Sequence, residues 1–168
     1  EVNDLNPAAL ALGGMTNGIS PLELTAAYAV FPNGGEYKEP ICYTRVLNSE
    51  DEVLFEKTSE SEQVYDEGVA WIMTDILRTV VTQGIGSSAA IGSQPVGGKT
   101  GTTDNNYDAW LSGFTPQYTM ALWMGNDVNI ELTSGSAMSA RFWSAIMSRV
   151  CEGLPTESFR DRPDNVIS

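Results

Sequence analysis

The sequence contains no histidine, only two cysteines and few basic residues. Zinc sites are built mainly from histidines and clustered cysteines, and here Cys42 and Cys151 lie far apart in the chain. We therefore expect no metal site, and nothing in the sequence calls for a cofactor. A disulfide between the two cysteines is open on spacing alone, but we interpret both as buried free thiols.

Basic residues are outnumbered by acidic ones, 9 against 22, which gives a formal net charge of −13. Such a surface repels the phosphate backbone of nucleic acids and the headgroups of an anionic membrane. We therefore expect no nucleic-acid partner. The simplest role of this charge is to keep the protein soluble.

The chain also lacks an apolar run long enough to span a membrane, a signal peptide and an initial methionine. It begins at Glu1 in a segment that resembles the interior of a domain. With 168 residues, 42% of them hydrophobic, it is long enough to bury a normal core. We expect one domain, or part of one, taken from a longer protein.

Local signals predict helices at three places. A capping box formed by Ser20 and Glu23, with Pro21 at the first helical position, begins a helix that Asn33–Gly35 ends. Asp66 caps a second helix with an apolar stripe of period 3.6 that runs to Val81. The third helix covers about residues 136–151.

Strands are predicted between these helices. Residues 36–48 are rich in β-forming side chains and contain Pro40, which indicates an edge or bent strand, and residues 53–55 form a short returning strand. Three more strands, at about 95–102, 107–114 and 118–126, follow one another with short turns and must be antiparallel neighbours. We predict an α+β fold with an antiparallel sheet flanked by helices. Residues 154–168 have no helical or strand periodicity, and we interpret them as a tail or linker.

Two groups of residues have simple structural interpretations. Trp110, Trp123 and Trp143 could form an aromatic platform for sugars, but their positions on strands and a helix favour core packing. The acidic cluster of Glu60, Glu62, Asp66 and Glu67 precedes a helix, where negative charge is favourable, and we interpret it as a solvated cap.

The segment Gly97–Thr103 has the most informative chemistry in the chain. On a strand, side chains alternate, so Thr100 and Thr102 share one face while Lys99 and Gly101 share the other. Two hydroxyls with this spacing can donate to one carboxylate, and Lys99 adds a compact positive charge nearby. Gly101 allows a ligand backbone to approach closely. The amide of Thr102, on a free strand edge, could donate to a developing oxyanion.

A Lys-Thr-Gly triplet on a strand is a signature of penicillin-binding proteins and serine β-lactamases. The chain as a whole resembles the penicillin-binding transpeptidases, and most closely their bifunctional class A type, from Asn6 to about Phe159. The blocks that carry the resemblance are Ala9–Gly14, Gly18–Leu24, Ala26–Ala29, Asn33–Gly35, Met73–Leu77, Val80–Val81, Gly84–Gly86, Gly98–Thr103 and Asp108–Pro116.

This resemblance implies a partial β-lactamase/transpeptidase-like fold over residues 1–153, and an enzyme that cross-links peptidoglycan. In that family a serine attacks the penultimate D-Ala of a stem peptide, and an amine on a neighbouring strand accepts the acyl group; β-lactams acylate the same serine. Carried over by position, Lys99 and Thr102 are the catalytic residues. Thr100, Gly101, Thr102 and Thr103 are the substrate-binding residues. The family also implies an extracytoplasmic location with a membrane anchor elsewhere in the intact protein.

The sequence departs from the family at two motifs. No serine is followed three residues later by lysine, so the nucleophile is absent, and Ser-x-Asn is missing from its place. Thr103–Asn105 resembles the second motif but is better explained as a hairpin turn. We therefore expect the C-terminal half of a transpeptidase domain, inactive without its N-terminal part. Exposed apolar surface normally covered by that part should make the isolated chain self-associate.

Two other functions stay open at this point. The first is a hydrolase of the same superfamily, either a D,D-carboxypeptidase or a β-lactamase, which would need a carboxylate that activates water. The second is a non-catalytic module that holds a carboxylate with the same threonines and lysine. Against the hydrolase, the block Asp108–Pro116 resembles the synthase. The module predicts reversible binding without a covalent adduct.

Overall fold

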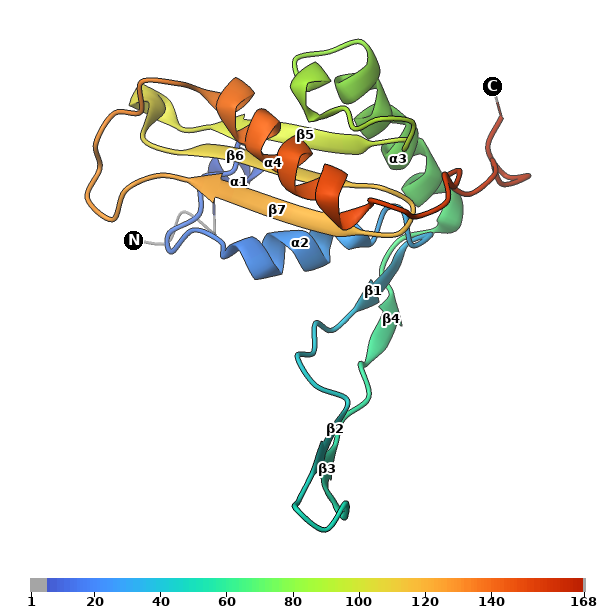
Figure 1. Ribbon diagram of the computed structural model, residues 1–168. Helices are drawn as coiled ribbons and strands as arrows, with labels where there is room; N and C mark the ends of the chain where they lie inside the picture. The colour runs from blue at the N-terminus through green and yellow to red at the C-terminus, as the bar shows by residue number, and fades with distance from the viewer. Residues whose placement is uncertain (1–5, 168) are drawn as a thin grey trace.

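The computed structural model describes residues 6–167. Its helices are α1 (Pro7–Ala11), α2 (Pro21–Ala29), α3 (Glu67–Thr82) and α4 (Ser136–Val150), with 3₁₀ turns η2 (Ser87–Ala89) and η3 (Asp104–Asn106). Its strands are β1 (Glu36–Lys38), β2 (Arg45–Leu47), β3 (Val53–Glu56), β4 (Ser61–Gln63), β5 (Gly97–Thr102), β6 (Ala109–Phe114) and β7 (Thr119–Met124). Figure 1 shows a small sheet with helices around it and a thin arm that projects from one end.

The central sheet is antiparallel, three-stranded and ordered β5-β6-β7. Helix α4 crosses one face (Figure 1), where Trp143 is fully buried against Leu111, Val96 and Met147. The indole N–H of Trp143 donates to the carbonyl of Met120 at 2.8 Å, so this large side chain also ties α4 to β7. The predicted α+β class is confirmed, and the three consecutive strands predicted for the sheet and the last helix agree with the observed ones within a few residues.

Helix α2 begins as predicted and protects one edge of the sheet. The hydroxyl of Ser20 accepts from the amide of Glu23, whose carboxylate accepts from the amide of Ser20 in return. Hydrogen bonds from the hydroxyl of Ser20, and secondly from its amide, lower the pKa of Glu23. One turn later the hydroxyl of Thr25 accepts from the outward amide of Ala121 on β7 at 2.9 Å. Edge strands expose unpaired amides to which another strand can bind, and the hydroxyl of Thr25 satisfies the amide of Ala121.

The arm differs from the prediction of one strand over residues 36–48. It is two short ladders in series, β1 with β4 and β2 with β3, separated by an irregular stretch that contains Pro40. Proline cannot donate to a ladder, which explains the break. Strand β4 was not predicted, because its sequence, Ser61–Gln63, has no apolar residue. Within the acidic cluster, Glu62 is therefore a strand residue, whereas Asp66 caps α3 by accepting from the amide of Gly68 at 2.8 Å.

Helix α3 buries only part of its predicted stripe. Ala70, Thr74, Leu77 and Val81 are buried and form one line along the helix. Val69, Ile72 and Ile76 lie beside this line and are 47%, 43% and 52% exposed. The second line is therefore an apolar surface that no described residue covers fully.

Three other side chains correct the sequence-based expectations. Trp143 is in the core as predicted, but Trp110 is only half-buried and Trp123 is 39% exposed. Both cysteines are free as predicted, yet only Cys151 is buried, because Cys42 lies on the exposed arm.

The short helix α1, capped by Asn6, was not predicted. Five residues give too short a pattern for a helical period.

The C-terminal segment has no helix or strand, yet it packs along α3. The ring of Phe159 meets Phe114 edge-on at 5.5 Å, and the guanidinium of Arg78 lies 5.7 Å from the centre of the same ring. The indole of Trp71 donates to the carbonyl of Arg160 at 3.1 Å. Near the end of the segment, Asn165 donates to Asp66, the cap of α3.

We expect Phe159→Ala to lower the free energy of unfolding by about 2 kcal/mol, because a half-buried phenylalanine and its aromatic contact are lost. Urea unfolding followed by circular dichroism measures this. Phe142→Ala is the matched control, since that ring on α4 is 50% exposed and should cost much less. A loss for Phe159→Ala no larger than that for Phe142→Ala would contradict the stabilising role of the Phe159 contact.

Candidate functional site

The predicted site lies on β5, the strand at the edge of the sheet that α2 does not cover. The amide of Thr103 donates to the carbonyl of Asp108 at 3.2 Å, so these two residues are a hydrogen-bonded pair at the end of the β5-β6 ladder. This pair sets the phase of the ladder, that is, which residues of β5 bond to β6 and which point away from it. Because antiparallel pairs alternate, Gly101 and Lys99 bond toward β6, and the amides of Thr102 and Thr100 point outward. The amide of Thr102 is therefore directed at the free edge.

Lys99 lies beside this edge with an exposed side chain. Its ammonium donates to the carbonyl of Thr100 at 2.8 Å, one of the groups that the ladder directs outward. Across the sheet, Lys99 is paired with Ser112, which is 2% exposed and whose hydroxyl has no hydrogen-bond partner. The positive charge of Lys99 thus lies beside the outward amides and carbonyls of β5, which are not paired with another strand.

Thr100 and Thr102 share the sheet face that α4 covers, as the alternation predicted. Their cross-strand partners are Leu111 and Ala109, and the first of these packs on Trp143 in the core. The two threonines differ in access, because Thr100 is 6% exposed and Thr102 is exposed. A ligand therefore reaches Thr102 more easily than Thr100.

Gly101 is the point of close approach on the opposite face. It pairs with Trp110, and a Cβ added to Gly101 would lie 3.3 Å from the Cβ of that tryptophan. The glycine leaves β5 without a side chain next to a large indole. This arrangement keeps the backbone of β5 accessible beside Trp110.

Thr103 closes the hairpin. Its hydroxyl donates to the carboxylate of Asp108 at 3.0 Å and accepts from the amide of Asp108 at 2.9 Å. Between them, Asn105 and Asn106 have φ of 58° and 55°, a conformation that asparagine tolerates in turns. The interpretation of Thr103–Asn105 as a turn is confirmed. The substrate contact predicted for Thr103 stays a prediction, since this hydroxyl already has a partner within the chain.

Sequence reasoning gave Asp108 no role at the site and interpreted Trp110 and Trp123 as core residues. Asp108 joins Thr103 to Trp123, whose indole N–H donates to its carboxylate at 2.8 Å. Trp110 and Trp123 are cross-strand neighbours with ring centres 6.3 Å apart. The order Asp-Ala-Trp directly after the turn was visible in the sequence, but only the register shows that these side chains meet beside β5.

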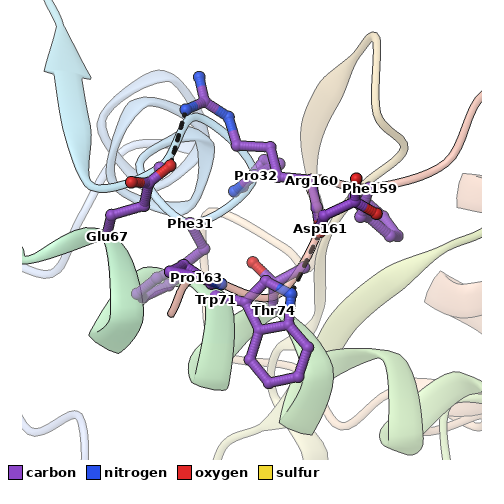
Figure 2. A pocket seen from close by; sticks show the side chains of 10 residues that line it. Phe31, Pro32, Glu67, Trp71, Thr74, Phe159, Arg160, Asp161 and Pro163 are labelled. Atoms are coloured by element: carbon purple, nitrogen blue, oxygen red, sulfur yellow. Dashed lines mark hydrogen bonds and ion pairs between the residues drawn. The ribbon is translucent and has the colours of Figure 1, made fainter. Parts of the chain in front are cut away.

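Figure 2 shows a pocket away from this site, between the end of α2, the start of α3 and the C-terminal segment. Arg160 pairs with Glu67 at 3.6 Å there, and its carbonyl accepts from Trp71. The space in it is about 10 Å³, at the lower limit of what a single water molecule needs. The residues of β5 do not line it, so we interpret this pocket as a packing gap and the edge of β5 as the candidate site.

Residues 3–148 match the family model described as the penicillin binding protein transpeptidase domain. The chain is 38% identical over 161 residues to penicillin-binding protein 1A of Aquifex aeolicus (strain VF5), covering 94% of this chain and 22% of that protein. It is 34% identical over 167 residues to penicillin-binding protein 1F of Bacillus subtilis (strain 168), covering 94% of this chain and 23% of that protein. The chain thus spans about a fifth of the length of these relatives.

Solved structures show the same fold. Penicillin-binding protein 1A from Haemophilus influenzae superimposes with a TM-score of 0.78 at 23% identity, covering 92% of this chain and 29% of that one. The D,D-transpeptidase domain of a peptidoglycan glycosyltransferase from Eggerthella lenta gives 0.68 at 24% identity, covering 81% of this chain and 33% of that one.

We expect Thr103→Val to lower the free energy of unfolding by about 1–2 kcal/mol, because it removes the hydroxyl that accepts from the amide of Asp108 and donates to one oxygen of its carboxylate. The hydrogen exchange rate of the Asp108 amide should rise with it. Thr102→Val is the control, since that exposed side chain should change stability by less than about 0.5 kcal/mol. The assigned role of Thr103 is wrong if both variants behave alike in urea unfolding and exchange.

Proposed function

The chain belongs to the penicillin-binding protein transpeptidase family, and from this membership we propose that it forms the C-terminal part of a D,D-transpeptidase domain that cross-links peptidoglycan stem peptides. A serine oxygen supplied by the rest of the domain attacks the carbonyl of the penultimate D-Ala. The terminal D-Ala leaves as an amine, and an acceptor amine then displaces the serine from the acyl group.

The observation that carries this proposal is the outward amide of Thr102 beside the exposed Lys99. Hydrolysis and transfer of an acyl group both pass through an oxyanion, and a fixed backbone N–H is a donor that stabilises it. Loss of one such donor typically costs about 3–4 kcal/mol of transition-state stabilisation. We assign Thr102 as one oxyanion donor, and the amide of the serine as the other.

The remaining residues of β5 have binding roles in this proposal. The hydroxyls of Thr100 and Thr102 hold the carboxylate of the donor peptide or of a β-lactam, and Lys99 adds positive charge. Gly101 lets the peptide backbone approach, and the free edge of β5 can pair with it as an added strand. Thr103 holds the end of the strand through Asp108 and lies next to the bound ligand.

The missing serine implies a partner within the same domain. We propose that the preceding half of the domain docks on the exposed apolar line of α3, Val69, Ile72 and Ile76, and brings its serine to the free edge of β5. Among the described residues, no helix is long and apolar enough to cross a membrane. We propose that the intact protein works outside the cell membrane and is anchored to it by a segment outside this sequence.

We expect the isolated chain to form no covalent adduct with benzylpenicillin, because it contains no Ser-x-x-Lys. Intact mass spectrometry after incubation is the measurement. The protein that also contains the preceding half should gain the mass of one penicillin molecule. An adduct on the isolated chain would contradict its incompleteness.

The same experiment separates the alternatives. Reversible binding without an adduct in the complete domain would favour a carboxylate-binding module. An adduct that forms and is released within minutes would favour a hydrolase. A long-lived adduct, with release of D-Ala only when an amine acceptor is present, supports the transpeptidase.

We also expect the isolated chain to self-associate at high concentration, because the exposed line on α3 is apolar. Size-exclusion chromatography with light scattering measures the mass. Ile76→Lys should shift the chain toward monomer, whereas Ile130→Lys, which adds the same charge on an exposed loop, should not. A strictly monomeric chain at high concentration would contradict this expectation.

A further inference from the structure

The arm, residues 36–63, has no role in the proposed chemistry. At its base, Glu36 and Lys38 line one hollow together with Thr115, which lies in the turn between β6 and β7. The turn Thr103–Asp108 lies at the other end of the sheet, so the arm leaves the molecule far from the candidate site (Figure 1). Strands β2 and β3 contact mainly each other, which leaves the outer part of the arm in solvent.

The outer part of the arm displays apolar side chains. Every residue of β2 and β3 is exposed, and five of the seven are apolar. Their exposed fractions run from 37% to 64%, for Val46, Leu47, Val53, Leu54 and Phe55. Among the described residues, each of these strands pairs with the other alone, so the ladder has two outer edges without a partner strand. Apolar strands with open edges are typical places for another chain to pair.

Polar interactions, rather than a core, hold this hairpin in shape. The side-chain oxygen of Asn48 accepts from the amides of Glu50 and Glu52, both at 2.9 Å, and its nitrogen donates to the carboxylate of Glu52. Arg45 pairs with Glu56 across the ladder at 3.2 Å. A two-stranded hairpin is only marginally stable in water, and these bonds support it without burying its apolar side chains.

The base of the arm is fixed to the body of the protein. The side-chain nitrogen of Gln63 donates to the carbonyls of Gly34 at 2.8 Å and of Tyr65 at 2.6 Å. Gly35 has φ of 91°, and the carbonyl of Tyr65 leaves no room for a Cβ there. The rings of Tyr65 and Phe31 are stacked with centres 6.0 Å apart. The arm is therefore mounted at a defined place between α2 and α3.

The charge of the arm indicates what it binds. The arm contains eight acidic and three basic residues, a net charge of −5. All three basic residues are already paired within the arm, Lys38 with Glu36, Arg45 with Glu56 and Lys57 with Glu39. The acidic residues that have no ion pair with any described residue are Glu50, Asp51, Glu52, Glu60 and Glu62. This surface favours a partner whose side chains are both apolar and basic.

We propose that β2 and β3 bind an extended segment of another protein that carries apolar and basic side chains. The segment adds a strand to an outer edge of the ladder through backbone hydrogen bonds. Its apolar side chains cover those of the hairpin, and its basic side chains meet the acidic residues that have no ion pair. The mounting of the arm holds this partner at a fixed place relative to the sheet, and its binding does not depend on the chemistry on β5.

Three other occupants fit this surface less well. A second copy would bring two arms of net charge −5 together, and an anionic membrane would meet Glu50, Asp51 and Glu52 at the tip. The preceding half of the domain has to bring its serine to Thr102, whereas the arm leaves the sheet at the opposite end (Figure 1).

Hydrogen exchange measured by mass spectrometry tests whether the arm is free. The amides of residues 45–56 should exchange at the same rate in the isolated chain and in the longer protein that also contains the preceding half of the domain. Slower exchange in the longer protein would show that its preceding half covers the arm. Slower exchange at raised protein concentration would show a second copy there, and either result would overturn the proposal.

The probe for binding is a fluorescein-labelled octapeptide of alternating lysine and valine with blocked ends. Titration with the longer protein, followed by fluorescence anisotropy, should show saturable binding, and the peptide should slow exchange at residues 45–56. A lysine–serine octapeptide keeps the charge and a glutamate–valine octapeptide keeps the apolar side chains, and each should bind about fivefold more weakly or worse. Equal binding of the lysine–serine peptide, or protection of β5 in place of the arm, would overturn the proposal.

A matched pair of variants tests the apolar contact. Leu54→Ser should weaken binding of the lysine–valine peptide about fivefold, because it removes an apolar side chain from the proposed contact. Ile130→Ser removes a similarly exposed aliphatic side chain from a loop outside the arm and should leave binding unchanged. Equal effects of the two substitutions would contradict a site on the arm.

A second pair tests the charge. Glu50→Gln combined with Asp51→Asn should weaken binding about threefold, as expected for two exposed charges. Asp51 has φ of 60°, which asparagine tolerates, so the turn should persist. Glu157→Gln combined with Asp161→Asn makes the same change in the C-terminal segment and should have no effect. If both double variants weaken binding alike, the peptide is attracted by the acidic protein as a whole and the proposal fails.

Penicillin acylation of the longer protein keeps this inference distinct from the proposed function. A protein that binds the lysine–valine peptide on the arm but gains no penicillin adduct would leave the inference standing and contradict the transpeptidase assignment. A protein that is acylated but does not bind the peptide would overturn the inference alone.

Discussion

The site depends on the phase of the ladder between β5 and β6. The link between Thr103 and Asp108 sets this phase at the turn, through two backbone-directed bonds and a side-chain bond. A shift by one residue would turn the amide of Thr102 toward β6 and exchange the faces of Lys99 and Thr100. Every proposed role on β5 therefore requires this one register.

Packing on both faces of the sheet makes that register hard to change. Gly113 lies under Trp143, where a Cβ would be 2.9 Å from the indole, and Gly97 lies under Phe114 at 2.7 Å. Any other residue at these points would force α4 or Phe114 away from the sheet. The core thus holds the strand from both sides, while the amides of Thr100 and Thr102 face a side on which β5 has no partner strand, which suits a strand that receives a ligand along its edge.

The same hairpin joins the site to the rest of the sheet. Lys99 and the outward amides of β5 favour an anionic group. At the turn, the carboxylate of Asp108 accepts from Thr103 and from the indole of Trp123, so it links the end of β5 to β7. A change at Thr103 or Asp108 should therefore disturb the strand that carries the site.

The sequence by itself determined the features that depend on neighbours within a few residues. These are the capping box of α2, the cap of α3 at Asp66, the three consecutive strands, the positions of Lys99 and Thr102, and the absence of a nucleophile motif. The spacing of side chains along one element encodes them directly. Only the tertiary structure decided which edge of the sheet is open, how the arm divides, that Trp123 is exposed, and that the C-terminal segment packs on α3. Contacts between residues far apart in the chain, such as Thr25 with Ala121 and Trp71 with Arg160, produce these features, and no local pattern records such pairings.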